Sequence, residues 1–224
     1  MPELIRVGHK GAAALAPGNT IASFDAAVAV GVEMIEFDVL PARDGSEIYV
    51  AHDHGELAAR SPLTLVEALA HMSTPRYAGV RLQLDIKRGG FEQRIVAALD
   101  EQGVRERAFI STGIVRTLTR LRVLAPDLAL GWTVPELPSA LLAVPPVARL
   151  YRNLLPARAA ARIRSGAIDA LVPHWALVTP DLVGAVNAAG GEIYAWTVDD
   201  AALIRRLQEL GVTGVISNDP RLFA

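Results

Sequence analysis

Short apolar runs and amphipathic stretches alternate along this chain from one end to the other. Apolar runs that stop at polar residues or glycine are typical of strands buried on both faces of a parallel sheet. Apolar residues at helical spacing, begun by a capping residue and closed by glycine, predict helices between these strands. The first unit places a strand over residues 4–8 and a helix that Thr20 caps and Gly31 ends.

This strand-helix unit repeats until eight parallel strands are predicted. The strands cover residues 4–8, 33–40, 80–86, 107–111, 128–134, 167–172, 192–198 and 213–217. The helices cover residues 20–30, 64–72, 91–102, 115–124, 141–164, 180–189 and 200–210. The Asp44-Gly45 turn adds a hairpin arm over residues 47–52 to the second strand. This count predicts an α/β fold, a (β/α)8 TIM barrel in a single domain over residues 1–224.

An open, doubly wound sheet is the alternative fold. It requires a glycine-rich phosphate loop after the first strand, and Gly8-His9-Lys10-Gly11 is not such a loop. The barrel is therefore favoured. Residues 135–146 hold four of the fourteen prolines and are expected to form an irregular loop or lid.

Composition narrows the functional classes. With 51% hydrophobic and 21% charged residues, a formal charge of −2 and no basic run, the chain has the character of a soluble globular protein and argues against nucleic-acid binding. It has no cysteine, so a bound metal must use oxygen or imidazole ligands. Neither a signal peptide nor a membrane-spanning apolar segment is recognisable, and we expect a cytoplasmic protein.

Carboxylates gather at the ends of two neighbouring predicted strands. Glu36 and Asp38 are two residues apart and so share one face of the second strand, while Asp85 and Lys87 repeat the spacing on the third. Crowded carboxylates on a buried strand need a cation or a hydrogen-bond donor to neutralise them, and a hard divalent metal is the economical solution. The alternatives are a solvated Glu-x-Asp pair and an internal ion pair between Asp85 and Lys87.

Two histidines end strands at the same face of the predicted barrel. His9 follows the first strand and His52 follows the hairpin arm, so both can reach one mouth, where a pair of imidazoles suits acid-base catalysis. Trp196 is expected to wall the pocket, with a core position as the alternative. No catalytic role is assigned to the remaining histidines, and one of them, His54, is expected in a loop.

These motifs, taken in order, resemble the glycerophosphodiester phosphodiesterases, a family of TIM-barrel phosphodiesterases. Family motifs of the forms H-R-G, P-E-N-T, I-E-x-D-V, D-G, H-D, E-x-K, W-T-V-N and G-V-D-G-I-I-T-D-x-P are all matched or approximated over nearly the whole chain. The matching segments are His9-Lys10-Gly11, Pro17-Gly18-Asn19-Thr20, Ile35-Glu36-Phe37-Asp38-Val39, Asp44-Gly45, His52-Asp53, Asp85-Ile86-Lys87, Trp196-Thr197-Val198-Asp199 and residues 211–220.

The resemblance implies a role for each matching residue. It implies that Glu36, Asp38 and Asp85 bind a divalent cation, Mg²⁺ or Ca²⁺, and that His9 and His52 are the acid-base pair. Lys10, Lys87 and Trp196 would contact the substrate. The implied reaction is the hydrolysis of a small-molecule glycerophosphodiester to glycerol 3-phosphate and an alcohol, by attack of water or of the neighbouring glycerol hydroxyl, which gives a cyclic phosphate.

The chain departs from the family pattern at four points. Lys10 replaces an arginine, Gly18 replaces the glutamate of P-E-N-T, and Asp85 replaces a longer glutamate. The family's insertion of some tens of residues after the second histidine is mostly missing, because only residues 55–62 separate His54 from Leu63. An open mouth is the expected consequence.

Two other functions remain open at this point. One is a phospholipase D-like or lyase activity on lysophospholipid head groups, which product analysis would distinguish. The other is a catalytically weak barrel that binds a phosphorylated ligand, suggested by the joint changes at Lys10, Gly18 and Asp85. The sequence leaves the head group, the identity of the metal and the oligomeric state open.

Overall fold

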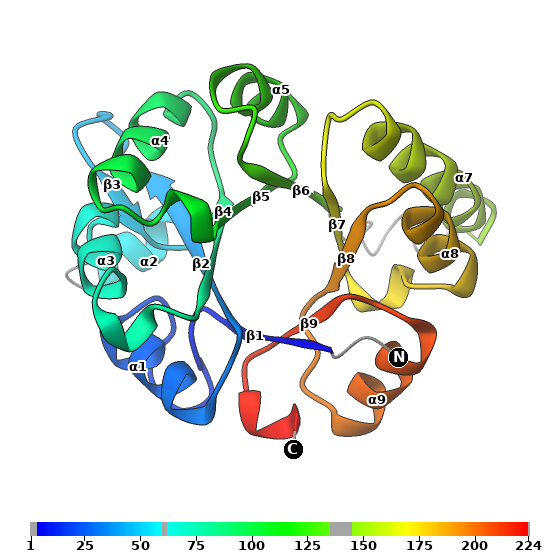
Figure 1. Cartoon of the computed structure of the whole chain (residues 1–224), viewed down its shortest axis with the longest axis horizontal. Coiled ribbons are helices and arrows are strands. Elements are labelled where there is room, and N and C mark those ends of the chain that lie inside the picture. Colours follow the sequence, from blue (N-terminus) through cyan, green and yellow to red (C-terminus); the bar gives the residue numbers. More distant parts are fainter. Residues whose placement is uncertain (1–3, 60–61, 135–144, 224) are drawn as a thin grey trace.

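Eight parallel strands close into a ring with helices around it (Figure 1). The computed structural model describes residues 4–59, 62–134 and 145–223. β1 pairs with β9 on one side and with β2 on the other, which closes the barrel. The strands are β1 (Ile5–His9), β2 (Met34–Pro41), β3 (Ile48–Val50), β4 (Arg81–Ile86), β5 (Ala108–Thr112), β6 (Ala129–Val134), β7 (Ala170–Pro173), β8 (Glu192–Ala195) and β9 (Gly214–Ser217).

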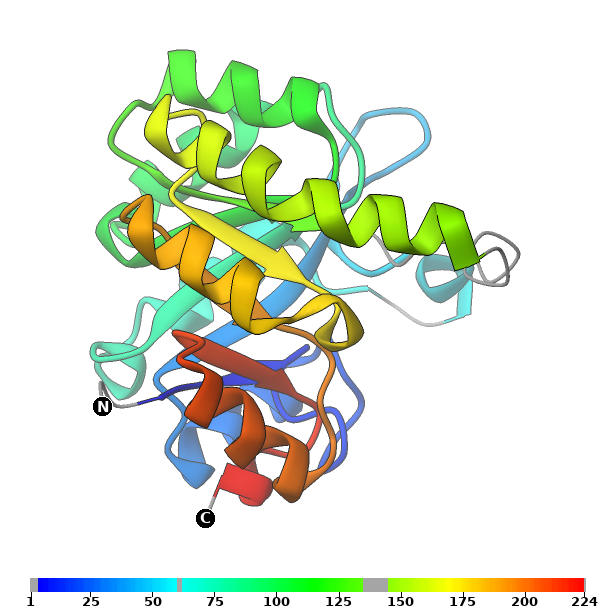
Figure 2. The ribbon, with the colours of Figure 1, turned by 90° about the vertical axis from the view of Figure 1, so that its right-hand side faces the viewer.

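The helices follow one another around the outside of the ring, and Figure 2 shows α7, α8 and α9 along one side of it. Their bounds are α1 (Ile21–Val30), α2 (His54–Ala59), α3 (Leu65–Met72), α4 (Glu92–Glu101), α5 (Val115–Leu124), α7 (Pro145–Arg164), α8 (Pro180–Ala188) and α9 (Ala201–Leu210). Within residues 4–59, 62–134 and 145–223, no helix combines the length and the apolar character needed to cross a membrane.

The predicted (β/α)8 barrel is confirmed, and the predicted strands and helices match the observed ones to within a few residues. β3 runs antiparallel to β2, as expected of the hairpin arm. The loop predicted for His54 is wrong, because this residue begins the short helix α2. Of the proline-rich loop expected over residues 135–146, residues 135–144 lie outside the described residues, and Pro145 and Pro146 begin α7.

Capping residues define where the first helices begin and end. The Thr20 hydroxyl oxygen accepts a hydrogen bond from the Ser23 backbone N–H, and the Thr20 backbone N–H donates to the Ser23 hydroxyl. Thr64 forms the same reciprocal cap with Glu67. α1 ends at Gly31, which has a φ of 92°, a conformation that glycine adopts without strain. These local signals explain why the helix bounds were accessible from sequence.

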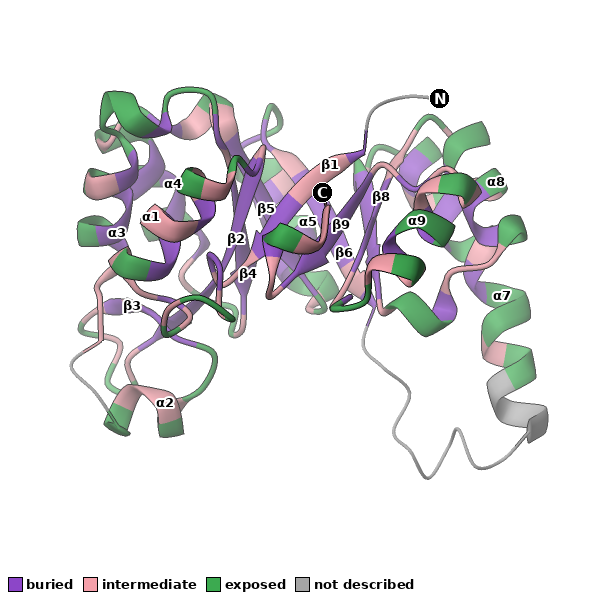
Figure 3. Ribbon diagram, turned by 90° about the horizontal axis from the view of Figure 1, so that it is seen from below, coloured by how far each residue is buried: buried purple, intermediate pink, exposed green. Residues whose placement is uncertain are grey.

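Two apolar layers hold the barrel together. The larger core lies between the strands and the helices, and Figure 3 shows buried strands flanked by helices whose outer faces are exposed. A second cluster fills the inside of the ring and includes Val7, Met34, Phe109 and Tyr194. Because side chains alternate along a strand, polar residues at every second position near the strand ends face this interior.

Candidate active site

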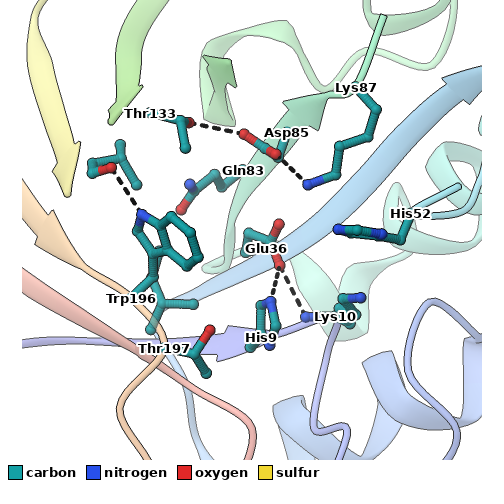
Figure 4. Close-up of a pocket in the computed structure, with 12 residues that line it drawn as sticks. His9, Lys10, Glu36, His52, Gln83, Asp85, Lys87, Thr133, Trp196 and Thr197 are labelled. Atoms are coloured by element: carbon teal, nitrogen blue, oxygen red, sulfur yellow. Dashed lines mark hydrogen bonds and ion pairs between the residues drawn. The ribbon is translucent and has the colours of Figure 1, made fainter. Parts of the chain in front are cut away.

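A cavity of about 170 Å³ lies at the carboxyl ends of the barrel strands. Seven of the eight residues that the sequence singled out line it (Figure 4). The eighth, Asp38, is fully buried and pairs with two of the lining lysines. The lining residues are His9, Lys10, Glu36, His52, Gln83, Asp85, Lys87, Thr133, Val172, Trp196, Thr197 and Ile216.

Three carboxylates converge at the edge of this cavity. Asp38 on β2 is in register with Asp85 on β4, and Glu36 shares the inward face of β2 with Asp38. One oxygen from each of the three carboxylates lies within 4.8 Å of the other two. All three residues are buried, and together they form a cluster that could hold a metal ion.

Two lysines neutralise part of this negative charge. Lys87 Nζ lies 2.7 Å from Asp38 Oδ1 and 2.5 Å from Asp85 Oδ2, while Lys10 Nζ lies 3.2 Å from Asp38 Oδ2. Burial acts to lower the pKa of Lys87, but the carboxylates of Asp85 and Asp38 outweigh it and raise the pKa above its ordinary value. The ion pair considered as an alternative does form, but as a part of the cluster.

The two lysines do not neutralise all of the negative charge of the cluster, and the pKa of Glu36 reflects the remainder. Burial and the neighbouring Asp38 carboxylate raise the pKa of Glu36 to about 8, although Lys87 opposes the shift. For Asp38, burial has the same tendency, but Lys87 and Lys10 outweigh it and hold its pKa low. Three buried carboxylates with two ammonium groups therefore suit one further cation, and an all-oxygen donor set suits Mg²⁺ or Ca²⁺.

His9 is held in one orientation by the other end of the chain. Its Nδ1 lies 2.6 Å from Asn218 Oδ1, and the Asn218 amide nitrogen donates to Asp199 Oδ2 at 2.6 Å. Because a carboxylate only accepts, the Asn218 oxygen faces the histidine and must accept from Nδ1–H. Nε2 is then the unprotonated nitrogen, and it lies 3.8 Å from Glu36 Oε2.

The environment of His9 favours its neutral form. Burial lowers its pKa from the ordinary value, although the hydrogen bond to Asn218 and the charge of Asp38 oppose this shift. A neutral imidazole with a bare Nε2 facing the cavity can accept a proton near neutral pH. This is the property required of a general base.

His52 reaches the same cavity from a different direction. It follows β3, the strand that the hairpin adds beside β2, and its side chain is 51% exposed. Its Nδ1 lies 3.3 Å from Asp53 Oδ2, which leaves Nε2 available at the mouth. The structure thus places one histidine inside the barrel and the other at its rim (Figure 4).

The loop after β1 positions Lys10 beside the carboxylate cluster. Lys10 has a φ of 51° and its backbone N–H donates to Glu36 Oε2 at 3.0 Å. Asn19, with a φ of 59°, donates to Asp38 Oδ2 at 2.9 Å. A Cβ added at Gly18 would lie 2.9 Å from Lys10 Cβ, so two of the departures noted in the sequence, Lys10 and Gly18, are coupled in space.

Sequence reasoning missed the residues that support the named ones. Asn218 follows β9 directly, and the rule that located His9 at a strand end applies to it equally. Gln83 shares the inward face of β4 with Asp85, so alternation could have identified it. Ser111 and Thr133 both donate to Asp85 Oδ1, at 2.8 and 3.0 Å, and nothing local in the sequence indicated that contact.

Two of the three remaining histidines, His71 and His174, contact residues that hold the fold together. His71 Nε2 lies 3.0 Å from Asp25 Oδ1, which ties α3 to α1. His174 packs edge-on against Trp196, with ring centroids 5.5 Å apart. The Trp196 indole N–H donates to Val172 O at 2.9 Å, so the ring forms a fixed wall of the cavity, as predicted.

Comparison with known proteins agrees with this architecture. A glycerophosphodiester phosphodiesterase from Caldanaerobacter subterraneus subsp. tengcongensis is 26% identical over 250 residues, which cover 96% of this chain and 93% of that protein. A crystal structure of a glycerophosphodiester phosphodiesterase from Agrobacterium tumefaciens superposes with a TM-score of 0.74 at 20% identity, covering 99% of each chain.

A second solved structure contains a ligand. The phosphodiesterase from Oleispira antarctica, in complex with the product sn-glycerol-3-phosphate, superposes with a TM-score of 0.73 at 24% identity, covering 96% of this chain and 93% of that one. Residues 9–61 and 73–222 match the Glycerophosphoryl diester phosphodiesterase family. Those segments contain the carboxylate cluster, both cavity histidines and both lysines. The chain therefore belongs to the glycerophosphoryl diester phosphodiesterase family.

Proposed function

We propose that this protein is a divalent-cation-dependent phosphodiesterase that hydrolyses glycerophosphodiesters to glycerol 3-phosphate and an alcohol. The observation that carries the proposal is the bare Nε2 of the partly buried His9 beside three converging carboxylates in one cavity. Family membership and the product bound to the related Oleispira antarctica enzyme support the choice of substrate.

Glu36, Asp38 and Asp85 would hold the divalent cation, with Mg²⁺ or Ca²⁺ as the proposed ion. A bound cation of this kind supplies Lewis-acid stabilisation of charge on phosphoryl oxygens. Lys87 and Lys10 lie at the same cluster and would add positive charge on the side where the phosphate must bind. Lysine offers a compact charge there, without the planar fork of an arginine.

The two histidines would divide the proton transfers. His9 Nε2 removes the proton from the attacking hydroxyl, a new oxygen–phosphorus bond forms, and the bond to the alcohol breaks. His52, at the rim, donates a proton to the departing alcohol oxygen. The attacker is water or the neighbouring glycerol hydroxyl, and a cyclic phosphate detected by ³¹P NMR would identify the latter.

Turnover of sn-glycero-3-phosphocholine by the purified protein tests this proposal. We expect release of glycerol 3-phosphate with Mg²⁺ or Ca²⁺ present, and loss of the reaction after chelation. His9→Ala should lower kcat by about 10²–10⁴-fold, the usual contribution of a general base. His71→Ala is the matched control, because His71 lies outside the cavity.

Two results would contradict the proposal. One is an absence of turnover by folded wild-type protein with either ion. The other is an unchanged kcat in a folded His9→Ala variant, which would remove His9 from the reaction.

A further inference from the structure

Gln83 holds an unpaired acceptor deep in the cavity. Its side chain is 1% exposed, it extends from the inward face of β4, and it lines the cavity beside Trp196 (Figure 4). Its Oε1 atom has no hydrogen-bond partner among the described residues. A buried polar atom without a partner costs free energy, so a ligand that supplies one is favoured.

Hydrogen bonds to Asp85 decide which end of the Gln83 amide faces the cavity. Ser111 Oγ donates its only proton to Asp85 Oδ1 at 2.8 Å. Ser111 can therefore only accept from Gln83, whose Nε2 lies 3.0 Å away. The nitrogen end is fixed on Ser111, and the free end of the amide is the carbonyl oxygen.

Three donors that line the cavity with Gln83 have other partners. The Trp196 indole N–H donates to Val172 O at 2.9 Å, and the Thr133 hydroxyl donates to Asp85 Oδ1 at 3.0 Å. Lys87 is held between Asp38 and Asp85. The neighbouring side chains thus leave Gln83 Oε1 to be satisfied by a group that enters the cavity.

The position of Gln83 along β4 indicates which part of a substrate would reach it. Gln83 precedes Asp85 by two residues, which places it roughly 7 Å deeper along the strand than the carboxylate cluster. The phosphate belongs near the cluster, where Lys10 and Lys87 lie. The part of the substrate that extends inward from the phosphate is therefore the part that meets Gln83.

We propose that Gln83 Oε1 accepts a hydrogen bond from the substrate hydroxyl most remote from phosphorus, and so selects phosphodiesters of a three-carbon polyol with a free terminal hydroxyl. The inference rests on the proposed function, and it makes Gln83 a substrate-binding residue. A substrate without that hydroxyl leaves the buried oxygen unpaired and is rejected, because polar sites discriminate strongly against ligands that lack the matching group.

Two substrates with one leaving group test the proposal. The 4-nitrophenyl phosphodiester of glycerol is compared with that of propane-1,2-diol, which keeps the hydroxyl next to the phosphate ester and lacks only the terminal one. Either route of attack on phosphorus therefore remains possible in both. Wild-type protein should prefer the glycerol compound by about 10- to 100-fold in kcat/KM.

Two variants test whether Gln83 causes this preference for the glycerol compound. Gln83→Met keeps the length of the side chain and removes the oxygen, and it should reduce the preference to less than about threefold. Thr133→Val removes a polar group from the same cavity whose proton is used by Asp85, so it should slow both substrates and keep the preference.

Each other outcome has a defined meaning. Equal kcat/KM values for the two substrates in wild-type protein would overturn the inference and leave the proposed function standing, and this comparison needs no variant. A Gln83→Met variant that retains the wild-type preference would also overturn it. Failure of wild-type protein to cleave either compound would overturn the proposed function together with the inference.

Discussion

Both ends of the barrel interior contain charged side chains, but only at one end do the charges balance. At the amino-terminal ends of the strands, Arg81 Nη1 donates to the Tyr194 hydroxyl at 3.0 Å, which donates to Glu192 Oε2 at 2.8 Å. Arg81 also lies 3.9 Å from Glu192 and packs over the Phe109 ring. One cation and one anion satisfy each other there, with a phenol between them.

The carboxyl-terminal end has three carboxylates for two ammonium groups. The difference is visible in Glu36, whose pKa burial and Asp38 raise to about 8, and in the Gln83 oxygen that has no partner among the described residues. The same strands therefore carry a closed polar network at one end and an open one at the other. Unbalanced charge and an unpaired acceptor make the carboxyl-terminal end the candidate ligand-binding end.

The largest expected effect is the increase in stability on adding a divalent cation, which should depend on the carboxyl-terminal end of the barrel and not on the amino-terminal end. Mg²⁺ or Ca²⁺ at about 100 times its dissociation constant should stabilise wild-type protein by about 2.7 kcal/mol in thermal or urea unfolding. Glu36→Gln removes a ligand and should abolish this response. In chelator, the same variant should be more stable than wild type by about 0.5–2 kcal/mol, because it relieves crowding of the carboxylates.

The control for this comparison is at the other end of the barrel. Arg81→Met should leave the stabilisation by metal at its wild-type size. If Glu36→Gln still responded to both ions, the assignment of Glu36 as a ligand would be wrong.

A pH-dependent effect should distinguish the amino-terminal end. Burial and Glu192 raise the pKa of Tyr194 above its ordinary value of 10.0, so the folded protein keeps this phenol protonated when the unfolded chain has lost the proton. The resulting stability is present below pH 10 and is lost as the pH rises above it, by up to about 1.4 kcal/mol per pH unit. Urea unfolding from pH 8 to pH 11 measures this slope.

Tyr194→Phe removes the group that titrates, so its stability should decline less steeply than that of wild type over this range. Tyr77, whose pKa is also raised, is present in both proteins and contributes equally to the two curves. Parallel curves would show that Tyr194 does not produce the difference.

The smallest effect on stability is expected from disrupting the hydrogen-bonded network of Arg81, Tyr194 and Glu192 at the amino-terminal end. Arg81→Met removes a donor to Tyr194 and a partly exposed ion pair with Glu192, and should lower the free energy of unfolding by about 1 kcal/mol. Its kcat should equal that of wild type, since Arg81 lies away from the cavity. A reduced kcat of the Arg81→Met variant at unchanged stability would show that the amino-terminal end also contributes to catalysis, and would contradict the contrast between the two ends.

The parts of the molecule that sequence could predict are those with local signals. Strand positions follow from apolar runs, and α1 follows from the cap at Thr20 and the glycine at its end. Alternation along β2 was enough to place Glu36 and Asp38 together. Helix α2 was missed because none of its residues is buried, so it has no apolar face to produce a pattern.

The supporting contacts could not be predicted in the same way, because they join distant segments. Asn19 reaches Asp38 from the loop after β1, and the Ser111 contact with Asp85 depends on the pairing of β4 with β5. The coupling of Lys10 with Gly18 depends on two backbone conformations that no sequence pattern indicated. The gathering of these residues at one end of the barrel could be predicted from the sequence, whereas their orientation required the structure.

The contact between His9 and Asn218 also bears on the order in which the protein can become functional. The two residues are 209 positions apart: His9 ends the first strand of the ring, and Asn218 directly follows the last one. On the ribosome, His9 emerges early and has no orienting partner until almost the whole barrel has been made. A barrel that has not closed cannot set the tautomer of His9, so incomplete translation products are expected to be inactive even if their carboxylate cluster has formed.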